Sequence, residues 1–255
     1  MLFGFDMQEV LPFIGVGFAA QLVDGALGMA FGVIANTLLL AIGLTPAAAS
    51  ANVHVIKVFT GAMSGISHIA HRNVDWKLCG RLSVAGVLGG LAGVQVITLF
   101  DQHRFTKPLI LAYLSTIGLY ILWRGIRQGH REGHVKVVEP VGFAGGFCDA
   151  TGGGGWGPVV TSNLLLQGSN PRMTVGTVNT AEFFLAVAVS AGFIFHLGLD
   201  DFSVAVVGLL IGGLIAAPMG AWLTKHIPAR PLMIMVGLVL TATSLFGVAK
   251  ALKLI

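Results

Sequence analysis

The sequence contains little charge. Charged residues make up 10% of its 255 positions and hydrophobic residues 55%, and the mean hydropathy is +0.86. A soluble domain usually carries about 25% charged residues, so this chain lacks the polar surface that a water-soluble fold needs. Several apolar stretches reach the roughly 20 residues that span a bilayer as a helix. The composition therefore predicts an all-α polytopic membrane protein whose surroundings are the lipid bilayer.

The number of cysteines and the net charge are also small, and both exclude classes of protein. There are only two cysteines, Cys79 and Cys148, and both lie in apolar segments, which is typical of small core side chains without a disulfide. The formal net charge is only +4. The basic residues of the chain lie in short loops, where they orient membrane spans. We therefore expect no nucleic-acid partner. The eight histidines are not spaced with carboxylates or thiols as metal ligands are. We therefore expect no metal and no cofactor.

One pattern occurs twice: an apolar run interrupted by an aspartate and then by glycines. The first copy spans residues 17–32, with Asp24, Gly25 and Gly28, and the second spans residues 142–157. In the second copy Asp149 is followed by five small residues: Thr151, Gly152, Gly153, Gly154 and Gly155. A helix that crosses lipid whole does not carry such a break at its middle. Each copy is predicted to be a broken, re-entrant helix, and the pair is predicted to face one site.

The two copies belong to a longer repeat. At an offset of 125 residues, 14 of the 59 positions from Gly17 to Asp75 are identical, and the matches favour glycine, proline and aspartate. This predicts two homologous halves of four segments each: 1–124, a basic cytoplasmic linker at 125–138, and 139–255. In the second half, Pro231 is expected to open the fourth segment.

Loop charges predict how the halves are oriented. Residues 71–81 contain three Lys or Arg, whereas the equivalent residues 196–206 contain none. Cytoplasmic loops carry the excess of Lys and Arg, so the two loops are expected on opposite sides of the membrane. Inverted repeats satisfy this, with the linker and the 71–81 loop in the cytoplasm and both termini outside. A parallel arrangement stays open.

Four formally charged residues fall well inside apolar spans: Asp24, Lys57, Asp149 and Glu182. A charge at mid-bilayer costs about 3 kcal/mol unless it faces a cavity or a partner, so such residues are functional candidates. Under the repeat, Lys57 matches Glu182. One interpretation is an ion pair that only locks the halves together. The other is that Lys57 attracts an anion while Glu182 or an aspartate carries a proton.

The glycines predict an anion site. Main-chain N–H groups at 25–28 and 151–155, at the start of a helix, suit an oxyanion, and Asn52, His54 and Asn179 are expected to complete the site. Close helix packing is the alternative role for these glycines, and capping of the break is the alternative role for the two aspartates.

The chain also resembles a known family. The residues that carry the likeness are Asn52-x-His54-x-x-Lys57-Val58-Phe59-Thr60, Ser64-Gly65-x-Ser67-His68, Asn73-Val74-Asp75 and Val178-Asn179-x-Ala181-Glu182-Phe183-Phe184. These runs are similar to those of the sulfite exporter TauE/SafE family of membrane permeases. The resemblance implies a multi-pass protein of the bacterial inner membrane that moves sulfite or organosulfonates.

The sequence thus predicts a transporter, expected to export small sulfur-containing oxyanions by alternating access, with proton coupling open. A divalent cation transporter is one alternative, with Asp24, Asp149, Glu182 and His54 as ligands. An intramembrane enzyme is another, for which Cys148 beside Asp149 is poor material, so we do not expect an enzyme. A non-transporting scaffold would not need charges at matching mid-span positions. A homodimer stays open.

Overall fold

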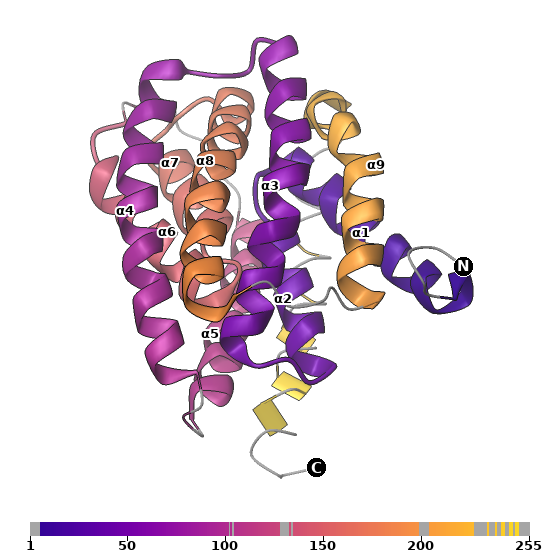
Figure 1. Cartoon of the computed structure of the whole chain (residues 1–255). Coiled ribbons are helices and arrows are strands. Elements are labelled where there is room, and N and C mark those ends of the chain that lie inside the picture. Colours follow the sequence, from indigo (N-terminus) through magenta and orange to yellow (C-terminus); the bar gives the residue numbers. More distant parts are fainter. Residues whose placement is uncertain are drawn as a thin grey trace.

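The computed structural model describes residues 6–127 apart from 102 and 104, residues 133 and 135–198, residues 204–226, and eight positions between 234 and 249. Most of the segment expected from Pro231, most of the linker at 128–134, and Asp200 lie outside the described residues. The described elements are all helical (Figure 1). In chain order they are α1 (Met7–Leu27), α2 (Phe31–Ala41), α3 (Pro46–Ala70), α4 (Trp76–Phe100), α5 (Thr106–Arg127), α6 (Glu139–Gly152), η1 (Gly157–Thr161), α7 (Ser162–Leu166), α8 (Pro171–Leu197) and α9 (Val204–His226).

Both expected helix breaks are present. α1 ends at Gly28, whose φ is 66°, and α6 ends at Gly153, whose φ is 67°. Only glycine adopts this left-handed conformation readily. The N–H of each glycine bonds the carbonyl of the aspartate four residues earlier, over 2.6 Å in both cases. The breaks therefore begin at the glycines, later than the sequence suggested, and Asp24 and Asp149 lie in the last turns of α1 and α6.

The halves also match after the breaks. Gly43 and Gly168 both have positive φ, 111° and 89°, at the ends of α2 and α7. Thr45 then caps α3 and Asn170 caps α8, each followed by a proline in the first turn. A proline suits this position because the first N–H groups of a helix have no partner within the helix. The order broken hairpin, long helix, long helix is thus repeated at matching positions.

Each broken hairpin packs on the other half. α1 lies along α9, α6 lies along α4, and α3 lies along α8 (Figure 1). α3 and α8 run antiparallel: Gly61 faces Phe183, whereas Gly65, further along α3, faces the earlier Thr180 of α8. α1 and α9 run in the same direction, as do α4 and α6.

Glycines permit the close approach of these helices. Gly86 of α4 lies against Gly146 of α6, and a Cβ on Gly89 would lie 2.0 Å from the carbonyl oxygen of Phe143. Within the described residues, α1, α4, α5 and α8 are each long and apolar enough to cross a membrane. α3 is equally long, but it carries a face of buried polar residues that lowers its hydropathy. The fold thus turns the polar face of α3 inward, while its apolar face stays exposed.

The packing predicts a difference between two glycines of the same helix. Gly89→Ala is expected to lower the melting temperature of the detergent-solubilised protein, because its Cβ would overlap main-chain atoms of α6. Overpacking of this kind costs about 1–3 kcal/mol. Gly80→Ala is the matched control, since no atom lies within 4 Å of its added Cβ. Equal melting temperatures for the two variants would contradict this packing.

Candidate functional site at the meeting of the two breaks

Lys57 lies halfway along α3 and is held between two carboxylates. Its Nζ is 3.0 Å from both carboxylate oxygens of Asp149 and 2.7 Å from Oε1 of Glu182. All three residues are buried, with 4%, 0% and 7% of their surface exposed, respectively. Removing such charges from water costs several kcal/mol per ion, which only close pairing offsets. Together with Asp24 and His54 they form what we call the central cluster.

Asp149 links the second break to α3. Its Oδ1 accepts the main-chain N–H of Trp156, across the break, over 3.0 Å. Its Oδ2 lies 3.0 Å from Nε2 of His54. The other ring nitrogen of His54, Nδ1, lies 2.8 Å from the carbonyl oxygen of Ser50, which can only accept a hydrogen bond. The ring of His54 is therefore held between a carboxylate oxygen of the second half and a main-chain carbonyl oxygen of its own helix.

Asp24 repeats this arrangement at the first break. Its Oδ1 accepts the N–H groups of Ala30 and Phe31 over 2.9 and 3.1 Å, at the start of α2. Phe31 and Trp156 occupy equivalent positions of the repeat. A carboxylate is favourable here because the first N–H groups of a helix are unpaired and carry partial positive charge. Each aspartate therefore holds the next helix in place across its break.

The breaks enclose a small cavity. Eleven residues line it: Asp24, Met29, Ala30, Gly32, Val33, Lys57, Asp149, Gly154, Gly157, Pro158 and Glu182. Its volume is about 10 Å³, which is room for about one water molecule. The main-chain N–H groups of Met29 and Gly154, at equivalent positions, have no acceptor among the described residues. Buried N–H groups are rarely left unpaired, so these two are candidate donors to a ligand.

Sequence reasoning missed two side chains that connect the breaks. Nδ2 of Asn36 donates to the carbonyl of Gly152 over 2.6 Å, and Oγ1 of Thr161 donates to the carbonyl of Gly28 over 2.9 Å. Asn36 and Thr161 are 125 residues apart, so they occupy one position of the repeat. A polar residue at the same place in two apolar helices is the signal that could have found them.

The predicted glycines are closely packed. A Cβ added to Gly25 would lie 2.5 Å from Gly220 of α9. Added to Gly152, Gly153, Gly154 or Gly155, it would lie 2.4–2.7 Å from its nearest neighbour. Gly25 and Gly152 lie within helices, and the N–H groups of Gly28 and Gly153 close the ends of α1 and α6. Tight packing accounts for Gly25, Gly152, Gly154 and Gly155, and the left-handed φ accounts for Gly28 and Gly153. Of these glycines only Gly154 lines the cavity.

Three other predicted residues lie outside the central cluster. Asn52 donates to the carbonyl of Ala48 on its own helix, over 2.8 Å. Thr151 donates to the carbonyl of Phe147 in α6, also over 2.8 Å. Asn179 lies one helical turn from Glu182 on α8 and contacts His68 instead. Local hydrogen bonds of this kind are common for short polar side chains.

The described helices form a bundle that contains apolar segments long enough to cross a membrane. Charged residues are buried at its centre and face one another, which is how integral membrane proteins hold such residues. Residues 13–247 match the family model described as Sulfite exporter TauE/SafE. The chain belongs to this family of membrane transporters.

One curated relative agrees with this assignment. The chain is 42% identical over 240 residues to a protein of Bacillus subtilis (strain 168) named "Probable membrane transporter protein YtnM", and the match covers 91% of this chain and 80% of the relative. No solved structure matches the chain.

The central cluster predicts strong coupling between its members. Lys57→Met should destabilise the protein by about 3–5 kcal/mol, because it leaves two buried carboxylates without their cation. Glu182→Leu combined with Lys57→Met should destabilise it by less than the sum of the single variants, by about 1 kcal/mol or more. Unfolding in denaturant, followed by tryptophan fluorescence, measures this.

The exposed ion pair between Arg81 and Glu139, 2.6 Å apart, provides the control. Arg81→Met should cost at most about 1 kcal/mol, as surface pairs do. Additive effects of the Lys57 and Glu182 changes would show that the two side chains do not interact.

Proposed function

We propose that this protein carries small sulfur-containing oxyanions, such as sulfite or organosulfonates, across the bacterial inner membrane by proton-coupled alternating access. The observation that carries the proposal is the position of Lys57, a buried ammonium beside two unpaired N–H groups where the two breaks meet. Ammonium and main-chain N–H groups are the donors that oxyanions need. The family match supports the same class of cargo.

Proton coupling follows from how Lys57 is held. Its ammonium is already bound by Asp149 and Glu182, so an anion has to compete with two carboxylates. Protonation of Glu182 or Asp149 would release part of the ammonium and make the cluster less negative. An oxyanion and a proton then bind best together, and both move in the same direction. The direction of net flux is set by the two gradients and the membrane potential.

Alternating access requires two arrangements of the halves around a fixed site. The antiparallel packing of the equivalent helices α3 and α8 supports inverted repeats, because two such helices cross a membrane in opposite senses. On this arrangement each broken hairpin re-enters on the side where it began. The basic residues of 71–81 and 125–138 orient the chain with these loops in the cytoplasm. The enclosed volume of about 10 Å³ implies that the cavity widens to admit cargo.

A divalent cation is the rival cargo, and the cluster argues against it. The described residues contain no group of three or more His, Cys, Asp or Glu placed to hold a metal ion. Nζ of Lys57 lies between the carboxylates, at the place that a cation would take. We therefore keep metal flux only as an outcome of the test. Nor do we propose an enzymatic reaction at this site.

Purified protein in proteoliposomes tests the proposal. We expect flux of sulfite or an organosulfonate above that of empty liposomes, and stimulation by a pH gradient. Lys57→Ala should lower this flux about tenfold or more, because a charge-assisted hydrogen bond contributes about 1.5–3 kcal/mol. Flux of divalent cations that survives Lys57→Ala, with no anion flux in the wild type, would overturn the proposal.

The carrier of the coupling proton is tested separately. Glu182→Gln should preserve sulfite exchange between the two sides while abolishing accumulation driven by a pH gradient, because the amide cannot take up the proton. Glu9→Gln, a change to an exposed carboxylate at the start of α1, is the matched control and should behave as wild type. Driven accumulation that persists undiminished in Glu182→Gln would assign the proton to another group.

A further inference from the structure

A second group of buried polar side chains extends from the central cluster along α3 and α8. On α3, Ser64 and His68 continue the face that carries Lys57, at three- and four-residue spacing through Gly61. On α8, Asn179 lies one turn from Glu182 on the same face. Nδ2 of Asn179 is 3.3 Å from Nε2 of His68, which ties the two helices together.

Beyond His68 the polar contacts continue to the end of the bundle. Nδ2 of Asn73 lies 3.3 Å from Nδ1 of His68. Arg172 donates through Nε to Oδ1 of Asn73 and through its guanidinium to the carbonyl of His71, the latter over 2.9 Å. His68 and Asn73 are fully buried, whereas this bond from Arg172 to His71 is exposed to solvent. The row of contacts therefore connects the interior with the surface.

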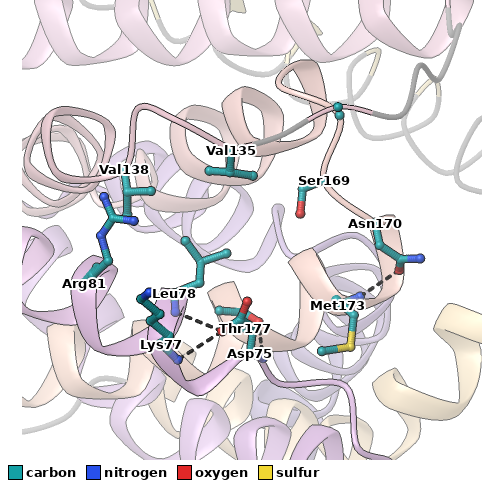
Figure 2. A pocket seen from close by; sticks show the side chains of 12 residues that line it. Asp75, Lys77, Leu78, Arg81, Val135, Val138, Ser169, Asn170, Met173 and Thr177 are labelled. Carbon is teal, nitrogen blue, oxygen red and sulfur yellow. Dashed lines mark hydrogen bonds between the residues drawn. The ribbon is translucent and has the colours of Figure 1, made fainter.

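An open pocket of about 450 Å³ lies close to this end of the row in the sequence, and Met173, which follows Arg172, is one of its lining residues (Figure 2). Asp75, two residues after Asn73, lines the pocket and donates its N–H to Thr177 Oγ1 over 2.9 Å. Lys77 and Arg81 line the same pocket from the start of α4, and Figure 2 shows them on the side opposite Asn170. Water in this pocket therefore lies near the exposed contact between Arg172 and His71.

Three buried side-chain oxygens on α1, α3 and α8 have no hydrogen-bond partner among the described residues. They are Oε1 of Gln21, Oγ of Ser64 and Oδ1 of Asn179, in residues that are at most 2% exposed. His68 also bonds the main chain of Gly25, one turn after Gln21 on α1. Buried polar groups are normally satisfied by protein or by ordered water. The unpaired oxygens of Ser64 and Asn179 lie between His68 and Glu182 along α3 and α8, and they are places where water can bind.

We propose that His68 relays protons between this pocket and the Lys57–Glu182 pair, and the inference rests on the proton-coupled transport proposed above. A proton from water at the pocket end binds one ring nitrogen, the other nitrogen gives its proton to water beside Ser64 and Asn179, and that water protonates Glu182. The reverse sequence restores the ring. The asparagines position the ring and the water and carry no proton themselves.

The charged groups around His68 suit this role. Arg172 on α8 and His71, the residue that follows α3, lie on the outer side of His68, and Lys57 with the carboxylates of Asp24 and Glu182 lies towards the centre. The sequence of α9, which also packs on α3, contains no titratable residue before position 225. The guanidinium of Arg172 at the outer end and two carboxylates at the inner end favour transfer of a proton inward.

The described residues of the second half contain no equivalent histidine at the matching position of α8. Phe193 occupies the position that corresponds to His68, and its ring lies 6.1 Å from that of His54, which corresponds to Asn179. The phenyl ring of Phe193 has no atom that can take up or release a proton. The path through His68 therefore serves only the end of the bundle where residues 71–77 lie.

Two measurements on the same proteoliposomes test the relay: sulfite exchange without a pH gradient, and sulfite accumulation driven by one. His68→Gln should keep exchange within about twofold and lower driven accumulation about tenfold or more, a factor that corresponds to about 1.4 kcal/mol. His68→Glu, which restores a titratable group, should recover part of the driven accumulation. His196→Gln, at an exposed histidine, is the matched control and should leave both rates unchanged.

The outcomes separate the two proposals. Absence of sulfite and sulfonate flux in the wild type overturns the proposed function. Normal flux in the wild type with unimpaired driven accumulation in His68→Gln overturns the relay alone. If His68→Gln does not fold, judged by its elution as a monodisperse species, Ser64→Ala serves instead. It should slow driven accumulation but not exchange, and equal rates in Ser64→Ala and wild type would overturn the relay.

Discussion

The structure depends on one carboxylate, that of Asp149. It accepts hydrogen bonds from the ammonium of Lys57 and from the main-chain N–H of Trp156, across the second break, and it contacts Nε2 of His54. A buried charge with these three partners is satisfied, whereas a buried charge without them costs several kcal/mol. The same group therefore holds α3 against the second half, fixes the break and sets the charge of the cavity. Structure and proposed transport rely on the same atoms.

The repeat explains why a second aspartate does only part of this. Asp24 holds α2 as Asp149 holds the helix after the second break. Lys57 and Glu182 occupy one position of the repeat, and they meet each other where α3 and α8 cross antiparallel. Two identical residues at that position would place like charges in contact. The substitution of opposite charges makes the contact favourable.

The sequence predicted those features that appear as a local pattern or as a repeat of one. The apolar composition, the glycines after each aspartate and the 125-residue offset are visible without knowledge of the fold, and so are the four charges in apolar spans. The bond from Asn36 to Gly152 and the pair of His54 with Asp149 join residues about 100 positions apart. Such contacts depend on how helices pack, which no local pattern encodes. Asn52 has a local hydrogen-bond partner, and its polarity alone could not place it.

The central claim is that an oxyanion binds Lys57 only when a neighbouring carboxylate takes up a proton. Calorimetric titration of the purified protein with sulfite, in buffers of different ionisation enthalpy, measures the protons exchanged on binding. The account predicts net proton uptake that disappears in Glu182→Gln or Asp149→Asn. Sulfite binding with no proton uptake, or with proton release, would contradict it.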